Sequence, residues 1–305
     1  MKRKISISTY LFQKKFGDKE ALKIAKEIGA DGVDFNLDVP ANSVDVSGSL
    51  YQRNDEEIFN YYKSIKEYAD EIGIEICQTH GRTPGYKNIP EEDEILIKNT
   101  RIDLLATKAL GAPYCVIHNA TSIYLGPDAE RSLMHKLSFE MFTKALTYAK
   151  EYNVKIATET FGDAVRFKSC DFFGNINEFL IAYNKIKNYK DLGKYFCICV
   201  DTGHSNKATL YGNPSAADVI RMCGNDVKCL HLNDNDKYTD QHKTPYTGTI
   251  DWEDVFNALD EIGYSGVYNL ELELRHFGED FCIEEAAFAI KVMRHVLKKR
   301  YPEEE

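Results

Sequence analysis

Short apolar runs alternate with longer amphipathic stretches along the whole chain. The short runs are rich in β-branched residues and predict strands at 4–12, 32–37, 74–80, 114–120, 155–161, 196–201, 227–234 and 266–274. The stretches between them carry apolar residues at helical spacing and predict helices at 18–30, 55–73, 91–110, 129–152, 175–188, 213–224, 251–263 and 284–300. Gly73 after the second helix and Asn175 before the fifth are suitable helix ends, and a loop is expected between residues 37 and 55.

The order of these elements is typical of a (β/α)8 barrel. Strand–helix pairs recur at intervals of about 30 to 45 residues, without a Pro/Ser-rich linker between them. The strand segments are nearly continuous in apolar residues, as expected for parallel strands buried on both faces. We therefore predict one α/β domain over residues 1–305, a single (β/α)8 TIM barrel. A doubly wound open sheet is the alternative, but no G-x-G-x-x-G motif follows the first strand to support a Rossmann dinucleotide site.

The composition is that of a folded, soluble protein, with 43% hydrophobic and 28% charged residues. No apolar run is long enough to span a bilayer, so no membrane association is expected. The start of the chain, MKRKISISTYLF, resembles a signal peptide only weakly, because Ser6 and Ser8 interrupt its apolar part. It is better explained as the first strand, and a cytoplasmic location is expected.

Cysteine usage and charge narrow the class of function. The eight cysteines form no C-x-x-C pair and most lie in apolar runs, so we expect buried, reduced thiols rather than disulfides or a zinc ribbon. The net charge of −10 disfavours nucleic acid as a partner, because phosphate contacts require lysine and arginine. A small-molecule partner is expected instead, and assembly into a homo-oligomer is left open.

Polar residues gather where the predicted strands end, which is where the active sites of (β/α)8 barrels lie. They are His80 and Arg82 after the third strand, His118 in the fourth, Glu159 in the fifth, Asp201 and His204 around the end of the sixth, His231 in the seventh, Asp240 and His242 in the loop after it, and Glu271 in the eighth. Five of the eight histidines are in this set, so the sequence predicts a functional mouth at this end of the barrel.

Carboxylates and imidazoles that converge in one mouth suit a borderline divalent cation. We predict one such ion, held by Glu159, Asp201, His231 and Glu271. Mn²⁺, Zn²⁺ and Co²⁺ accept this mixture of oxygen and nitrogen ligands, whereas Mg²⁺ prefers oxygen alone and is less expected. A polar network without metal is the competing interpretation, and it has to explain three carboxylates within apolar strands. Glu273 is two residues from Glu271, so strand alternation does not choose between them.

The remaining polar residues are candidates for contact with the substrate. They are His80, His118, His204, His242 and Arg82. Each histidine can equally be a hydrogen-bonded group that lines the mouth. Arg82 can bind a phosphate together with Lys237 and Lys243, although solvated loop charges explain these three residues as well.

Five segments resemble the sugar phosphate isomerase/epimerase family of the xylose-isomerase-like barrel superfamily: ATETFGD (157–163), CVDTGHS (199–205), CLHLNDND (229–236), DQHKTPYTGTIDW (240–252) and GYSGVYNLELEL (263–274). The resemblance covers the whole chain. It implies that Glu159, Asp201, His231 and Glu271 match the four metal ligands of ketose 3-epimerases, and that His204 matches a histidine that contacts the substrate. In those enzymes the two metal-bound glutamates also serve as the acid/base pair, which assigns Glu159 and Glu271 as catalytic.

The resemblance leads to a main hypothesis and two alternatives. The main hypothesis is a divalent-metal-dependent isomerase or epimerase of a sugar or sugar phosphate, which works by proton transfer through an enediolate. The first alternative is a metal-dependent phosphodiesterase similar to endonuclease IV, because His80, His118, Asp240 and His242 correspond to further ligands of that enzyme. The second alternative is a barrel that binds a sugar without catalysis.

Overall fold

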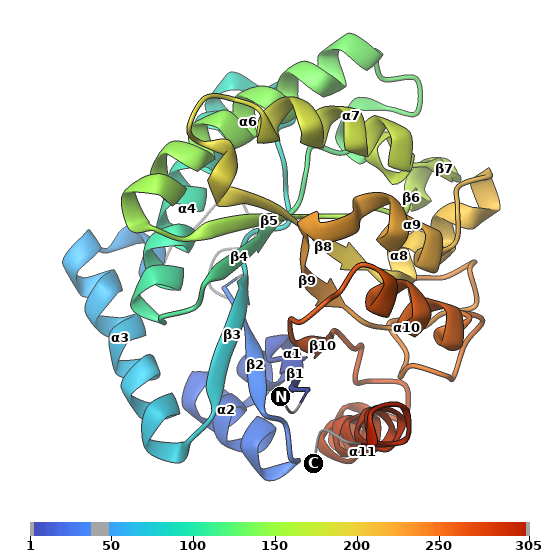
Figure 1. The fold of residues 1–305 in the computed structure, drawn as a ribbon. Coiled ribbons are helices and arrows are strands. Elements are labelled where there is room, and N and C mark those ends of the chain that lie inside the picture. The colour runs from blue at the N-terminus through green and yellow to red at the C-terminus, as the bar shows by residue number, and fades with distance from the viewer. Residues whose placement is uncertain (1–2, 38–48, 303–305) are drawn as a thin grey trace.

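Parallel strands stand at the centre of the molecule and helices surround them (Figure 1). The structure is a computed structural model that describes residues 3–37 and 49–302. The central strands are β1 (Ile5–Ser8), β2 (Gly32–Asn36), β3 (Glu75–His80), β4 (Tyr114–Ile117), β5 (Lys155–Glu159), β8 (Phe196–Asp201), β9 (Val227–His231) and β10 (Tyr268–Leu270). They pair in the order β10-β1-β2-β3-β4-β5-β8-β9. Residues 38–48 of the expected loop lie outside the described residues.

The two edges of this sheet meet. Leu232, directly after β9, forms a parallel bridge with Leu270 of β10. The backbone N–H of Leu232 donates to the carbonyl of Asn269 at 2.8 Å, and that of Glu271 donates to Leu232 at 3.3 Å. The sheet is therefore a barrel, which confirms the (β/α)8 prediction and excludes the doubly wound open sheet.

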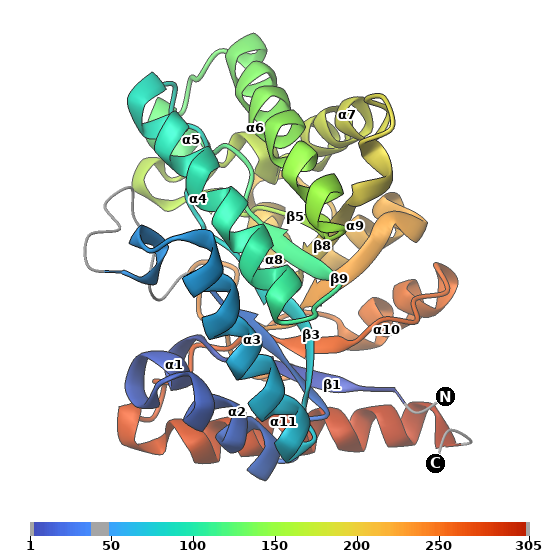
Figure 2. The same ribbon diagram turned by 90° about the vertical axis from the view of Figure 1, so that its left-hand side faces the viewer.

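Helices between the strands form the outer layer. The long ones are α2 (Asp18–Glu27), α3 (Asp55–Ile72), α4 (Pro90–Ala109), α6 (Arg131–Tyr152), α7 (Ile176–Lys187), α9 (Ala216–Cys223), α10 (Trp252–Glu261) and α11 (Cys282–Arg300). Shorter ones are α1 (Tyr10–Phe16), α5 (Ser122–Leu125) and α8 (Thr202–Ala208), with 3-10 turns at Leu50–Gln52, Val165–Phe167, Phe172–Gly174, Gly193–Tyr195, Thr209–Tyr211, Gly224–Asp226 and Glu279–Phe281. Figure 2 shows that the last helix, α11, runs beside α1 and α2.

Local sequence signals account for the helix ends. Asn54 and Glu57 form a reciprocal capping box at the start of α3, and Gly73 ends this helix with φ at 70°, a left-handed conformation that glycine adopts without strain. The side chain of Asn175 accepts hydrogen bonds from two backbone N–H groups at the start of α7, as its position in the sequence predicted.

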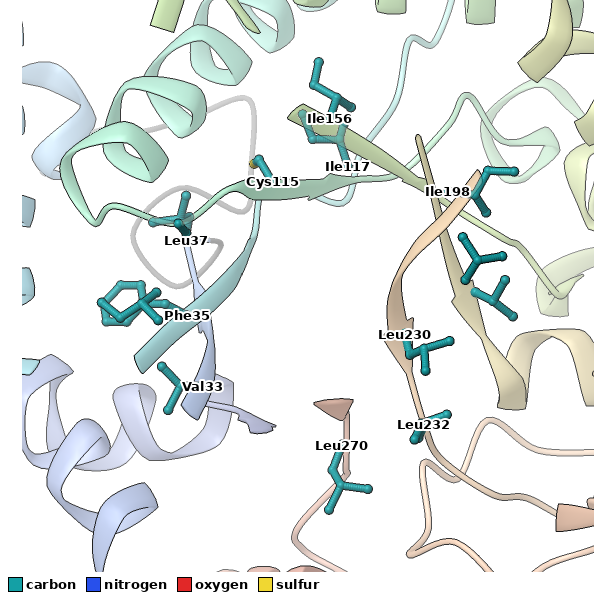
Figure 3. Close-up of a cluster of buried hydrophobic side chains, with 14 of the residues drawn as sticks. Val33, Phe35, Leu37, Cys115, Ile117, Ile156, Ile198, Leu230, Leu232 and Leu270 are labelled. Atoms are coloured by element: carbon teal, nitrogen blue, oxygen red, sulfur yellow. The ribbon is translucent and has the colours of Figure 1, made fainter. Parts of the chain in front are cut away.

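The main core lies between the strands and the helices. Outward-facing strand side chains such as Val33, Phe35, Ile198 and Leu230 are fully or almost fully buried against the helices (Figure 3). A smaller apolar cluster of Val116, Ala157, Cys197, Cys199 and Cys229 comes from the alternate strand positions and fills the barrel interior. All eight cysteines lie in the described segments as free thiols; seven are buried and Cys170 is half-buried.

Seven of the eight predicted strands are shorter in the structure, and the first and last differ most. The strand predicted at 4–12 ends at Ser8, and Tyr10–Phe16 form α1, because this segment buries Leu11 and Phe12 on one helical face and leaves Lys14 and Lys15 in solvent. The strand predicted at 266–274 pairs only over Tyr268–Leu270.

Two elements at the barrel mouth were not predicted. One is α8, which starts directly after Asp201, and the other is the small hairpin of β6 (Asp163–Ala164) and β7 (Ser169–Cys170). Within the described ranges, no helix combines the length and apolar character needed to cross a membrane.

Candidate active site

The carboxyl ends of the barrel strands surround a cavity of about 320 Å³. Its lining consists of Ser8, Tyr10, Asn36, His80, Thr83, His118, Glu159, His204, Asp240, His242, Glu271, Leu272 and Glu273. Parallel strands that start and end at similar heights place their last residues at one edge, so these side chains come together although they are far apart in the sequence. The mouth predicted from the sequence is therefore one connected site.

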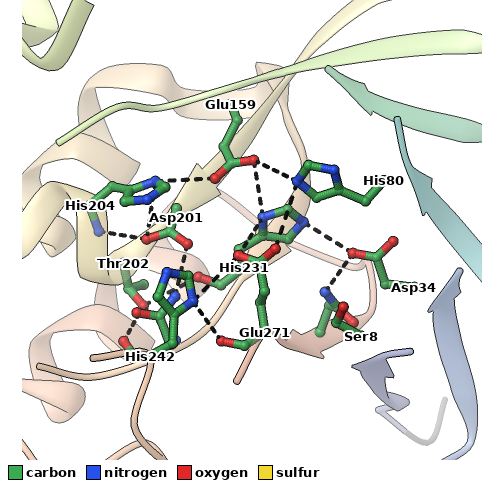
Figure 4. Close-up of polar contacts among 12 residues, drawn as sticks. Ser8, Asp34, His80, Glu159, Asp201, Thr202, His204, His231, His242 and Glu271 are labelled. Atoms are coloured by element: carbon green, nitrogen blue, oxygen red, sulfur yellow. Dashed lines mark hydrogen bonds and ion pairs between the residues drawn. The ribbon is translucent and has the colours of Figure 1, made fainter. Parts of the chain in front are cut away.

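The predicted metal-ligand set has two residues in the cavity lining, Glu159 and Glu271, and two that do not line it, Asp201 and His231. Glu159, Asp201 and His231 are the last residues of β5, β8 and β9, and Glu271 directly follows β10. One ligand atom from each of the four residues lies within 4.8 Å of all the others. His231 Nδ1 is 3.2 Å from Glu159 Oε2 and 3.2 Å from Glu271 Oε2, so this nitrogen faces both carboxylates (Figure 4).

Unpartnered atoms at the centre of this set fit a bound cation. Glu159 is 1% exposed and His231 is fully buried, yet Glu159 Oε2 and His231 Nδ1 have no hydrogen-bond partner among the described residues. Burying such groups without a partner costs free energy of several kcal/mol. A divalent ion between a carboxylate oxygen and an imidazole nitrogen would satisfy both, so the donor set fits the cation that the sequence predicts.

Three more groups of potential ligands share residues with the first group: His80 joins His231 and Glu271 in one, and the other two flank it. His80 and His118 share Glu159 with it, and His118 Nε2, also without a hydrogen-bond partner, is 3.0 Å from Glu159 Oε2. On the other side, Asp201 groups with His204 and His242. The mouth therefore contains more potential ligands than one cation needs.

The buried Lys207 lies beside Asp240, the carboxylate that contacts His204 and His242. Asp240 Oδ2 is 3.7 Å from His204 Nε2 and 3.5 Å from His242 Nε2. Lys207, only 2% exposed, places its Nζ 2.8 Å from Asp163 and 3.8 Å from the other oxygen of Asp240. Sequence reasoning missed Lys207. Its position three residues after His204, on the same side of a helix, is the signal that could have revealed it.

Burial and the neighbouring charges shift the pKa values in the mouth. Burial lowers the pKa of His80, but the contacts with Glu159 and Glu271 outweigh it and raise the value to about 9. Burial raises the pKa of Asp201 to about 6, against the opposing charge of His204. Burial also acts to raise the pKa of Glu159, yet the charges of His231 and His118 hold it well below its usual range. Glu159 is therefore ionised at neutral pH, as a metal ligand or general base must be.

The predicted phosphate cluster does not assemble at the mouth. The Arg82 side chain is 2% exposed and does not line the cavity; its backbone N–H donates to Asp103 Oδ2 at 3.2 Å, and its positive charge acts on the same carboxylate. Lys243 lines a separate groove with Phe277. Contact between Arg82 and a substrate stays a prediction.

Comparisons with known proteins agree with this fold. A family model described as xylose isomerase-like TIM barrel matches residues 22–297. An uncharacterized protein of Sinorhizobium fredii is 27% identical over 286 residues, which cover 86% of this chain and 83% of that protein.

Solved structures of similar fold include a D-psicose 3-epimerase with D-tagatose from Clostridium cellulolyticum H10, at 17% identity and a TM-score of 0.73, covering 96% of this chain and 99% of that one. The IOLI protein with a binding zinc atom has the same identity and TM-score and covers 97% of this chain and 98% of its own. At these identities the likeness shows the fold alone.

Proposed function

Because the chain belongs to the xylose isomerase-like TIM barrel family, we propose that it is a metal-dependent isomerase or epimerase of a small sugar. The observation that carries the proposal is the pair of carboxylates, Glu159 and Glu271, that face His231 Nδ1 at 3.2 Å each in the floor of the cavity. The presence of a ketose 3-epimerase among the proteins of similar fold supports it. The volume of the cavity suits a small molecule.

The two glutamates have complementary roles in this proposal. One removes the proton from the carbon next to the substrate carbonyl, and the other returns a proton to give the product through an enediolate. If the proton is returned to the opposite face of the same carbon, the product is an epimer of the substrate. Both side chains need a fixed position for this task, which their places at the ends of β5 and β10 provide, with Glu159 buried and Glu271 half-buried.

The other polar side chains hold the substrate. His80, His118, His204 and His242 line the cavity and present ring nitrogens to sugar hydroxyls. Glu159, Asp201, His231 and Glu271 would hold a divalent cation, of which Mn²⁺, Zn²⁺ or Co²⁺ suit the donors, and the zinc named for the IOLI protein supports this choice. When bound, the cation would act as a Lewis acid on the substrate oxygens and offset the charge of the enediolate.

The charge of the lining predicts a substrate without phosphate. Four carboxylates line the cavity, and among the described lining residues there is neither lysine nor arginine; residues 38–48 contain none in their sequence either. We expect deuterium from solvent to enter free ketoses at least about tenfold faster, as kcat/KM, than the matching ketose 6-phosphates, because each added negative charge near a carboxylate costs about 1 kcal/mol or more. Equal or faster exchange in the phosphate esters would contradict this specificity, whereas exchange in neither class would count against the isomerase.

The two flanking ligand groups favour a second candidate. His80, His118 and Glu159 on one side, and Asp201, His204 and His242 on the other, can hold additional cations around a phosphodiester, as in an enzyme similar to endonuclease IV. The net charge of −10 and the acidic cavity lining speak against a long nucleic acid as substrate.

We expect the protein not to incise an oligonucleotide with an abasic site, even at low salt with Zn²⁺ or Mn²⁺ supplied. Elemental analysis after dialysis should find one tightly bound cation per chain. Three cations per chain, together with incision of one DNA strand, would favour the hydrolase over the isomerase. The incision should then be lost in His80→Ala and His118→Ala. The barrel and the four central ligands would be unaffected by that result.

A further inference from the structure

A carboxylate outside the predicted ligand set lies directly behind it. Asp34, in the middle of β2, points into the barrel and is fully buried. Its Oδ2 is 3.1 Å from His231 Nε2, on the side of the imidazole opposite to Glu159 and Glu271 (Figure 4). We propose that Asp34 is a positioning residue, which holds His231 in the tautomer and orientation that present Nδ1 to the cation. This inference rests on the proposed function, in which His231 is a ligand.

The surroundings of Asp34 fix the direction of this hydrogen bond. Two more donors reach the same oxygen, Gln78 Nε2 and Asn269 Nδ2, each at 3.1 Å. Ser6 donates to Asn269 Oδ1 at 2.8 Å, so the amide of Asn269 is held with its NH₂ group toward Asp34. Side chains from β1, β3 and β10 therefore keep Asp34 as a hydrogen-bond acceptor. In the hydrogen bond between His231 and Asp34, the proton is on His231 Nε2.

A proton on Nε2 leaves the lone pair of Nδ1 available. Nδ1 is the atom that faces Glu159 and Glu271 and that has no hydrogen-bond partner among the described residues. A carboxylate that accepts from the far nitrogen of a ligating histidine also increases the basicity of the ligating nitrogen. The contacts of Asp34 therefore do more than fill the barrel floor, since they prepare one particular atom for a cation.

A purely structural role explains Asp34 less well. Its second oxygen, Oδ1, is buried and has no hydrogen-bond partner in the described part of the chain. A buried carboxylate with an unsatisfied oxygen lowers the stability of the fold, and an apolar side chain of similar size would avoid that cost. A role in preparing His231 accounts for an acid at this position.

Asp34→Asn keeps the shape of the side chain and removes its negative charge. Gln78 Nε2 and Asn269 Nδ2 turn the amide oxygen toward the position of Oδ2, so His231 still donates from Nε2, but the hydrogen bond is weaker and Nδ1 is less basic. We expect the affinity for Zn²⁺, measured by competition with a chromophoric chelator, to fall about 10–100-fold. Asp171→Asn is the matched control, because it neutralises another buried carboxylate, which lies outside the cavity, and its affinity should stay close to that of the unmodified protein.

The tautomer of His231 can be measured directly, and a folding defect would not produce the same result. Ring ¹⁵N NMR of the zinc-loaded, unmodified protein should show His231 protonated at Nε2 and unprotonated at Nδ1, with His231→Ala used to assign the signal. Protonation at Nδ1, or unchanged zinc affinity in the Asp34→Asn variant, would overturn the inference. Unchanged zinc affinity in His231→Ala would instead remove His231 from the ligand set, so failure of the metal site and failure of the Asp34 role give different results.

Discussion

Replacement of Glu159 or Glu271 by glutamine should lower the rate of proton exchange in a ketose by about 10²–10⁴-fold, the usual contribution of a general acid or base. The amide has the shape of the carboxylate but cannot take up a proton near neutral pH. Sugar binding should change far less, because the histidines that line the cavity are retained. The measurement is deuterium wash-in from solvent over a panel of free ketoses, together with the dissociation constant of the sugar.

Both glutamates are also proposed metal ligands, so the metal content of each variant has to be known. Exchange rates should be compared only between preparations with equal metal occupancy. Glu285→Gln is a suitable control, since Glu285 is a buried glutamate that contacts His276 at 2.7 Å outside the cavity. Rapid exchange in a metal-loaded Glu159→Gln or Glu271→Gln protein would show that the glutamate in question is not the acid or base.

Replacement of His231 by alanine should remove the tightly bound cation. His231 supplies the nitrogen of the four-residue set, and its loss leaves Glu159, Asp201 and Glu271 close together without the imidazole that separates their charges. A set of oxygen ligands alone binds a borderline cation such as Zn²⁺ less tightly than a set that includes an imidazole, so the remaining carboxylates should not retain the ion through dialysis. Elemental analysis of dialysed protein should give about one cation per chain before the substitution and only a small fraction after it.

His135→Ala is the matched control for this experiment. His135 is a half-buried histidine whose Nε2 is 2.6 Å from Glu178, and neither residue lines the cavity. Its removal should leave the metal content unchanged. Equal metal content in the His231→Ala protein and the unmodified protein would refute the ligand assignment.

The sequence by itself determined the barrel and the end of it that carries the site. Parallel strands buried on both faces leave nearly continuous apolar runs, which made the strands visible without any knowledge of their partners. His80, Glu159, Asp201 and His231 lie at or near the ends of these runs and are the final residues of β3, β5, β8 and β9 in the structure. The register of the sheet brings such residues to one edge, as the pairing of Asp201 with His231 illustrates. Their convergence follows from fold class alone.

Some segments fit two structures equally well from their sequence, and tertiary contacts decided which structure they form. The apolar run after Ser8 fits a strand or a helix, and it forms α1 because Leu11 and Phe12 find a buried surface on one side only. Glu271 and Glu273 lie two residues apart and are equivalent in a regular strand. The strand ends at Leu270, however, and the next residues leave the sheet, so that Glu271 faces His231 while Glu273 pairs with Arg275.

Contacts between distant parts of the chain decided the positions of the residues that support the site. Asp34 meets His231 across 197 positions of sequence, and no local pattern distinguishes it from an ordinary polar residue within a strand. Lys207 was hidden because α8 was not predicted, and Arg82 contacts Asp103, which lies 21 positions later in the sequence. Residue types at strand ends identify the potential ligands, but the supporting partners of each ligand depend on the closure and register of the barrel, which only the folded chain establishes.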